Sequence, residues 1–199
     1  GYYAAVFAFV LSTAQAAPDA SEPMIAPDFT GTTATGETVS LSDYAGKRVV
    51  LEWTNDGCPF VQKHYAVPPA NMQGLQTDAS ESDVVWLSII SSAPGKQGHR
   101  TGAEILDMNE GRGATPEHVI IDESGDIGRL YKAKTTPHMF LITEDGMVAY
   151  QGAIDDTPSA RVSDIETATN YVSAAMQSVA AGEPVEVASS KPYGCSVKY

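Results

Sequence analysis

The 199-residue chain combines an ordinary globular composition with a strong negative charge. Hydrophobic residues make up 43% and charged residues 19% of the chain, and the formal net charge is −13. This length supplies enough apolar surface for one folded domain whose core does not depend on disulfide bonds. A field of this sign repels phosphate backbones and anionic lipid headgroups, which excludes nucleic-acid and membrane-surface binding as expected functions.

The first residues have the pattern of a secretory signal peptide. Residues 1–16 carry no charge and pass from an apolar stretch to small residues at Ala14 and Ala16, the A-x-A pattern of a signal-peptidase site. The apolar stretch is too short to span a bilayer. Because no initiator Met or basic region precedes it, we expect a truncated signal peptide, with a native apolar helix as the alternative. Export to a bacterial periplasm would allow the two cysteines to pair, and no membrane insertion is expected after cleavage.

The remaining chain alternates predicted strands and helices. Residues 17–27, rich in Ala, Pro, Asp and Ser, form an expected flexible lead-in. The patterns then predict a hairpin over 28–33 and 38–41, a strand over 48–54, a helix from 58 interrupted at Pro68-Pro69 and resuming to about 75, a strand over 84–90, a helix over 103–109, a strand over 118–121, a short helix to 131, strands over 139–143 and 147–151, and a helix over 160–181. This order indicates one α/β domain over 28–182, followed by a tail, 183–199.

Cys58 lies where an apolar strand turns into a helix. Asn55-Asp56-Gly57 forms the expected turn, and Pro59 occupies the first helical position, where its missing N–H costs nothing. The free N–H groups and positive dipole end of a helix stabilise a thiolate, the reactive form of cysteine. We therefore expect Cys58 to be a nucleophile; the alternative is a small buried residue at a helix start.

The run over 49–61, the Thr136-Pro137 pair and the strand-turn-strand pattern over 140–152 resemble the thioredoxin fold in its redoxin and peroxiredoxin-like (AhpC/TSA) branch. The resemblance covers roughly residues 27–181. It implies a thioredoxin-like three-layer α/β/α sandwich with a central mixed sheet and an N-terminal hairpin extension. It also implies that Pro137 is cis and lies beside the active-site cysteine, where adjacent backbone can pair with an incoming disulfide or peptide.

The resemblance assigns a role to Glu52, and the position of His138 in the sequence suggests another. Glu52 matches an acidic strand residue that relays protons to the resolving thiol, although ordinary strand alternation could instead point it to solvent. His138 directly follows the expected cis proline and could face Cys58, where it would stabilise the thiolate. His64 is more simply placed on a solvated helix face.

The sequence departs from the family pattern at Val61. This residue holds the place of the second thioredoxin cysteine, so the usual CxxC disulfide cannot form. It also holds the place of the peroxide-attacking cysteine of peroxiredoxins, so the resemblance does not establish peroxidase activity. The sequence is similar to a peroxiredoxin-like group that keeps only the first thioredoxin cysteine.

Cys195 is the natural candidate for a second redox thiol. It lies in the tail, which is long enough to fold back over Cys58. Three states remain open: a reversible Cys58–Cys195 bond, a permanent structural bridge, and a free or intermolecular Cys195. A permanent bridge closing so long a loop would stabilise the fold by about 4 to 5 kcal/mol in the chain-entropy estimate.

Three functions follow from these residues. The first is an exported thiol-disulfide oxidoreductase that acts on protein disulfides, with Cys58 as nucleophile and an unknown thiol as electron donor. The second is a thiol peroxidase, in which Cys58 reduces a hydroperoxide and its sulfenic acid condenses with Cys195. The third is a non-catalytic protein- or metal-binding module with a structural disulfide. A Cys/His metal site with His64 and His138 is conceivable, but we expect neither a metal nor another cofactor.

Overall fold

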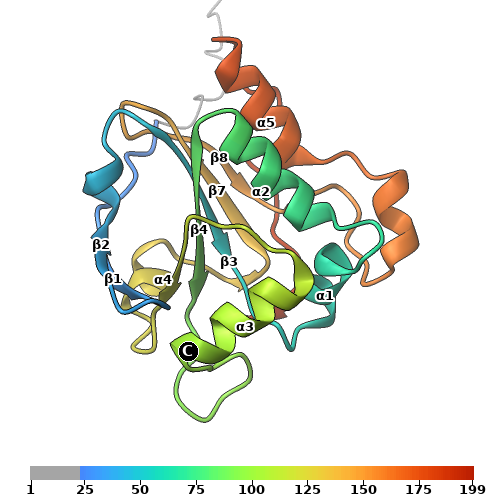
Figure 1. Ribbon diagram of the computed structural model, residues 1–199. Coiled ribbons are helices and arrows are strands. Elements are labelled where there is room, and N and C mark those ends of the chain that lie inside the picture. Colours follow the sequence, from blue (N-terminus) through green and yellow to red (C-terminus); the bar gives the residue numbers. More distant parts are fainter. Residues whose placement is uncertain (1–22) are drawn as a thin grey trace, which may run out of the picture.

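The computed structural model describes residues 23–199, which fold around a seven-stranded sheet (Figure 1). The expected signal peptide, residues 1–16, and most of the lead-in lie outside the described residues. Within residues 23–199, no helix has the length and apolar character needed to cross a membrane.

The sheet is mixed and has the strand order β2-β1-β5-β4-β3-β7-β8. The strands are β1 (Thr30–Thr33), β2 (Thr38–Ser40), β3 (Arg48–Trp53), β4 (Val84–Ile90), β5 (His118–Ile121), β7 (His138–Ile142) and β8 (Val148–Gly152). β3, β4 and β5 are parallel, and all other pairings are antiparallel. The predicted central mixed sheet and N-terminal hairpin extension are therefore confirmed.

The two central strands are buried on both faces of the sheet. All seven residues of β4 and five of the six residues of β3 are buried. Their near-continuous apolar sequence suits parallel strands that are covered on each side. Because side chains alternate along a strand, Val50 and Glu52 point to one face, and Leu51 and Trp53 point to the other.

Helices and turns cover both faces, as Figure 1 shows. The face of Val50 and Glu52 is covered by α1 (Pro59–Tyr65), α2 (Asn71–Glu81), α3 (Gly102–Arg112) and α5 (Tyr171–Ala180). On the face of Trp53, α4 (Asp126–Leu130) and the 3-10 turn η1 (Leu41–Tyr44) contribute to an aromatic-rich core. The predicted three-layer α/β/α sandwich is confirmed.

The prediction of the last helix was wrong in its extent. In place of one helix over 160–181, the structure has a 3-10 turn, η2 (Val162–Glu166), and then α5. Asn170 separates the two: its side chain caps α5 by accepting from the Ser173 amide at 2.8 Å, and its extended backbone forms an isolated bridge with Asp155. The bridge is a long-range contact that helix periodicity does not reveal. The helix predicted to resume to about residue 75 is α2, which extends to Glu81.

The 183–199 segment returns along the fold to the start of α1. Ser189 forms a bridge with Gln151 of β8, and farther along β9 (Cys195–Ser196) pairs antiparallel with β6 (Thr135–Thr136). The Ala93 amide then donates to the Lys198 carbonyl at 2.8 Å. The sequence indicates a tail that can reach Cys58, but it does not predict this strand pairing.

Candidate functional site

A hydrogen-bonded turn places Cys58 at the start of α1. The Asn55 side-chain oxygen accepts from the Gly57 amide at 3.0 Å, and the Asn55 carbonyl accepts from the Cys58 amide at 3.0 Å. Gln97, from the loop after β4, binds both the Asn55 side chain and the Gly57 carbonyl. Cys58 is the residue that precedes the first helical turn, and Pro59 lies in that turn. The turn is therefore held from two sides and fixes the position of the sulfur.

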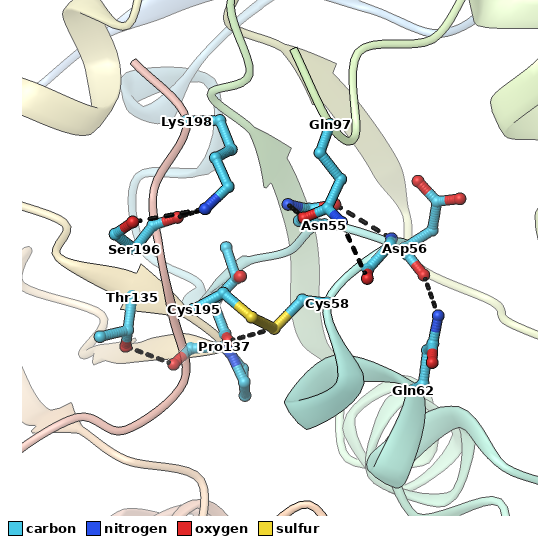
Figure 2. Close-up of a disulfide and its surroundings, with 12 residues drawn as sticks. Asn55, Asp56, Cys58, Gln62, Gln97, Thr135, Pro137, Cys195, Ser196 and Lys198 are labelled. Atoms are coloured by element: carbon cyan, nitrogen blue, oxygen red, sulfur yellow. Dashed lines mark hydrogen bonds between the residues drawn. A yellow bond between two sulfur atoms is a disulfide. The ribbon is translucent and has the colours of Figure 1, made fainter.

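Cys58 and Cys195 form a disulfide across 137 residues, with their Cα atoms 6.0 Å apart (Figure 2). Cys195 lies opposite Thr136 in the β6–β9 pairing, and the Thr136-Pro137 peptide bond is cis. The Cys58 sulfur lies 3.3 Å from the Thr136 carbonyl oxygen. A disulfide sulfur has no proton to donate, so this contact becomes a hydrogen bond only when Cys58 is a thiol. The cysteine pair and the cis proline therefore meet at one place.

Gly194 allows the segment to approach the cis-proline strand this closely. Its φ angle is +146°, and a Cβ atom built there would overlap the Thr136 carbonyl oxygen. A residue with a side chain cannot keep this backbone path without displacing β6. The glycine directly before Cys195 is thus a requirement of the docked geometry.

Glu52 is fully buried beneath the helices and accepts several hydrogen bonds. The donors to its carboxylate are the Tyr65 hydroxyl at 2.6 Å, the Ser88 hydroxyl at 2.7 Å, the Trp86 indole at 2.9 Å and the Gln76 amide at 3.5 Å. Among the described hydrogen bonds, none joins Glu52 to either cysteine. The structure therefore places Glu52 on the α1 side of the sheet, away from solvent, but not in direct contact with the disulfide.

His138 does not face Cys58. It lies opposite Trp53 in the β3–β7 pairing and stacks on Phe140 at 4.9 Å, on the sheet face away from α1. Its Nδ1 atom accepts from the Lys134 amide at 3.2 Å. Burial, with a smaller effect of the Lys134 charge, lowers the pKa of His138 to about 4, so the ring is neutral near pH 7. The expectation that it faces Cys58 is wrong because the side chain follows the strand alternation set by its pairing with β3.

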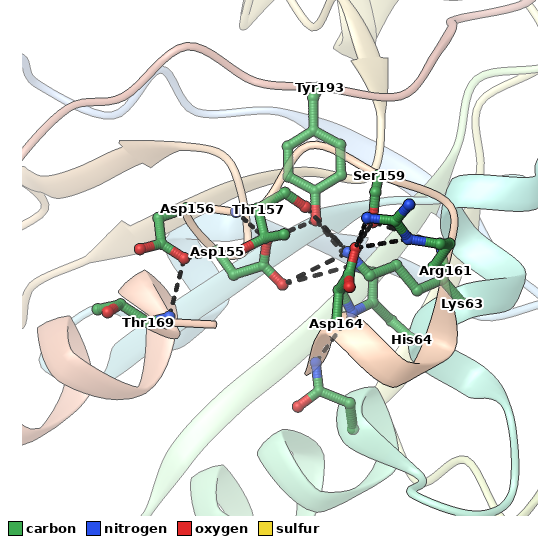
Figure 3. Close-up of polar contacts among 11 residues, drawn as sticks. Lys63, His64, Asp155, Asp156, Thr157, Ser159, Arg161, Asp164, Thr169 and Tyr193 are labelled. Carbon is green, nitrogen blue, oxygen red and sulfur yellow. Dashed lines mark hydrogen bonds and ion pairs between the residues drawn. The ribbon is translucent and has the colours of Figure 1, made fainter. Parts of the chain in front are cut away.

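A buried polar cluster lies next to the disulfide, where the sequence predicts a solvated helix face. His64 and Lys63 of α1 have no exposed side-chain surface, and Asp155 is 2% exposed. All three contact Tyr193, two residues before Cys195 (Figure 3). The predicted solvent exposure of His64 is wrong because the 183–199 segment covers this part of α1.

Sequence reasoning missed Lys63, Asp155 and Tyr193 as members of the site. No residue spacing links the three, because the fold brings them together from α1, the chain after β8 and the 183–199 segment. One pattern in the sequence could have drawn attention to Tyr193. It lies two residues before Cys195, and in an extended segment side chains two residues apart point to the same side. Within residues 23–199, no group of three or more His, Cys, Asp or Glu side chains is arranged to hold a metal ion.

Comparison with solved structures places the chain among thioredoxin-like proteins. It is similar to an uncharacterized conserved protein from Geobacillus kaustophilus, with 22% identity, a TM-score of 0.71, and coverage of 89% of this chain and 91% of the other. A hypothetical protein from Sinorhizobium meliloti gives 20% identity, a TM-score of 0.70, and coverage of 89% and 93%. A protein assigned as the thiol:disulfide interchange protein DsbE from Chlorobium tepidum gives 26% identity, a TM-score of 0.51, and coverage of 65% and 82%.

Sequence comparison gives the family. A search of curated proteins found no match. The Redoxin family profile matches residues 16–169, a range that contains Cys58, Glu52 and Pro137 but ends before Cys195. The fold, the cysteine at the start of α1 and the cis proline beside it agree with that match. This chain is a thioredoxin-fold redox protein and belongs to the Redoxin family.

Proposed function

We propose that this chain is an exported thiol-disulfide oxidoreductase in which Cys58 is the nucleophile and Cys195 the resolving thiol. The observation that carries the proposal is the position of Cys195. It is bonded to Cys58 while its backbone pairs with Thr136, beside the cis Pro137. An exchange partner would need this same position for its own sulfur to reach Cys58.

The reaction begins from the dithiol form. The Cys58 thiolate attacks one sulfur of a protein disulfide, and the other sulfur leaves as a thiolate that takes up a proton. Cys195, as a thiolate, then attacks the Cys58 sulfur in the mixed disulfide and releases the second partner thiol. The partner disulfide gains two electrons, and the Cys58–Cys195 bond forms. The relative reduction potentials set the direction, and an external thiol restores the dithiol.

The closed form protects its nucleophile from solvent. Cys58 is fully buried, whereas Cys195 is half-buried in the covering segment. A reducing thiol therefore reaches Cys195 more easily than Cys58. Attack at Cys195 would release Cys58 as the thiolate at the start of α1, where helix amide groups favour the anion.

The proposal is tested with Cys195→Ser and Cys58→Ser variants of the full chain. Cys195→Ser should trap a mixed disulfide between Cys58 and a peptide disulfide, visible by mass spectrometry, and Cys58→Ser should abolish exchange. If the native disulfide resists glutathione and dithiothreitol in the folded protein, the bond is structural and the oxidoreductase proposal fails. Consumption of hydrogen peroxide at a rate that depends on Cys58 and exceeds disulfide exchange would instead identify a thiol peroxidase.

Export and the domain limits belong to the same proposal. The uncharged apolar pattern of residues 1–16 and the A-x-A site support cleavage near residue 17. Residues 28–182 would then form the thioredoxin-like domain, with 183–199 as its covering tail. Expression of the precursor in a bacterial host, followed by cell fractionation and N-terminal sequencing, should find the protein in the periplasm with Ala17 near its first residue.

A further inference from the structure

The 183–199 segment occupies the place that an exchange partner must take. It lies extended along β6, with Cys195 paired to Thr136 and bonded to Cys58. Before the cysteine, Tyr193 and Gly194 make specific contacts with the domain. The segment therefore provides a template for the side chains that fit around Cys58.

The Tyr193 hydroxyl has a complete set of hydrogen bonds in the buried cluster. It donates to Asp155 Oδ1 at 2.5 Å, and it lies 3.2 Å from Lys63 Nζ and 3.2 Å from His64 Nε2. Lys63 also donates to the Thr157 carbonyl at 2.9 Å. A phenolic oxygen has one proton and two lone pairs, so one donated and two accepted bonds satisfy it fully.

The protonation of His64 fits the role of donor to this hydroxyl. Burial, and to a smaller extent the Lys63 charge, lowers the pKa of His64 to about 3, so the ring is neutral. The Asn71 amide lies 2.9 Å from His64 Nδ1 and can donate to it, which leaves the ring proton on Nε2. His64 Nε2–H therefore donates to the Tyr193 oxygen.

These partners make the cluster selective for a hydroxyl group. Without the hydroxyl, the Asp155 carboxylate loses its shortest contact and keeps the bond from the Thr157 amide at 3.0 Å, with Lys63 Nζ 3.9 Å away. His64 Nε2 is then left 4.0 Å from Asp155 Oδ2, beyond hydrogen-bond distance. An aromatic ring without oxygen would thus leave the buried His64 Nε2–H unpaired and would remove one hydrogen bond each from Asp155 and Lys63. Sites that hydrogen-bond a hydroxyl discriminate strongly against the analogue that lacks it. Apolar packing alone would hold a tail at lower cost than a buried lysine and aspartate.

We propose that Lys63, His64 and Asp155 form a tyrosine-binding subsite for the exchange partner. The partner is a protein segment that approaches β6 in extended form, with tyrosine two residues before its reactive cysteine and glycine between them. This inference rests on the proposed thiol-disulfide exchange and names its substrate class. The glycine requirement follows from the overlap that any Cβ at Gly194 would have with the Thr136 carbonyl.

The test uses the full chain with Tyr193→Ala and Cys195→Ser, which vacates the subsite and leaves Cys58 as the reacting thiol. We would compare three peptides: Pro-Tyr-Gly-Cys-Ser, Pro-Phe-Gly-Cys-Ser and Pro-Tyr-Ala-Cys-Ser. Each carries 2-nitro-5-thiobenzoate on its cysteine. Attack of Cys58 on the peptide sulfur forms the mixed disulfide and releases the coloured thiolate. The tyrosine peptide should react about tenfold or more faster than the phenylalanine peptide, because its hydroxyl regains the bonds to Asp155 and Lys63 that a phenylalanine ring cannot make. The Tyr-Ala-Cys peptide should also be slower.

Added Asp155→Asn or Lys63→Met substitutions should bring the tyrosine-to-phenylalanine rate ratio close to one. Asp156→Asn is the matched control, because Asp156 binds Thr157 and Thr169 and not Tyr193, and it should keep the ratio. Circular dichroism identifies any variant that does not fold. Because Asp155→Asn and Lys63→Met are made in separate variants, either one can test the subsite if the other does not fold.

The outcomes separate the subsite from the proposed function. Equal rates for all three peptides would overturn the subsite and leave exchange intact, whereas no reaction of Cys58 with any peptide or free disulfide would defeat exchange itself. A third outcome concerns the wild-type chain. If it forms disulfide-linked dimers, and if an excess of the tyrosine peptide does not prevent them, the preferred occupant of the subsite is the 183–199 segment of a second copy. That result would overturn the external partner.

Discussion

Tyr193→Phe should make the Cys58–Cys195 disulfide easier to reduce. The substitution removes the hydroxyl and its bonds to Asp155, Lys63 and His64 but keeps the ring, which packs edge-on against Phe60 at 5.9 Å. Hydrogen bonds to charged groups contribute about 1.5 to 3 kcal/mol each, and some of this returns through rearrangement within the cluster, so a net loss of about 2 kcal/mol is expected. The loss falls on the state in which the 183–199 segment is docked.

If reduction releases the segment, this loss weakens only the disulfide form. The reduction potential should then rise by about 40 mV, because 30 mV corresponds to about 1.4 kcal/mol for a two-electron couple. Equilibration in glutathione buffers, followed by alkylation and mass spectrometry, measures the shift. Tyr44→Phe is the matched control: Tyr44 is half-buried and its hydroxyl makes no hydrogen bond among residues 23–199, so the substitution should leave the potential unchanged.

One result would refute the reasoning. If Tyr193→Phe lowers the free energy of unfolding by a similar amount in the oxidised and reduced proteins and leaves the potential unchanged, the segment stays docked in both states. Urea unfolding of both forms distinguishes the two cases.

Three further predictions follow from the described contacts. Gly194→Ala should prevent the 183–199 segment from docking closely on β6 and leave free thiols after equilibration with oxidised glutathione. Gly74→Ala, by contrast, has nothing within 4 Å of the new Cβ and should stabilise its helix by about 0.5 to 1 kcal/mol in urea unfolding. Burial lowers the pKa of His138 to about 4 and of His64 to about 3, below the ordinary 6.5 of the unfolded chain. The folded state thus binds fewer protons than the unfolded chain below pH 6.5. The free energy of unfolding, which is fully present above pH 6.5, should fall by about 1 to 2 kcal/mol per histidine between pH 7 and 5. Replacing either histidine with glutamine should flatten the dependence of this free energy, measured by urea unfolding, on pH. Glu52→Gln should slow resolution of the mixed disulfide by about tenfold to a hundredfold and change its pH-rate profile if Glu52 relays protons, whereas an unchanged profile with lower stability would indicate a structural role.

The sequence was most informative where local patterns and burial agree. The apolar runs that became β3 and β4 predicted central strands, because strands covered on both faces must be apolar throughout. The Gly57-Cys58-Pro59 sequence predicted a cysteine at a helix start because proline is compatible with only a few positions in a helix. The cis Thr136-Pro137 bond came from resemblance to the family.

The features that the sequence did not predict depend on contacts between distant segments. The direction of His138 is set by its pairing with Trp53, and the burial of His64 by the docking of Tyr193. The break before α5 follows from the Asp155–Asn170 bridge. In each case the local sequence permits two environments, and the tertiary fold selects one.

The non-covalent contacts of the 183–199 segment bear directly on how the disulfide functions. After reduction releases the segment, redocking through these contacts brings Cys195 back to Cys58, so resolution proceeds as an intramolecular step at high effective concentration. The same contacts exclude a partner from β6 and from the Lys63–Asp155 cluster. Docking strength therefore has opposite effects on partner entry and on resolution. Because Tyr193 contributes through hydrogen bonds that a partner tyrosine can replace, one residue can leave the site and another can enter it without leaving the buried charges unpaired.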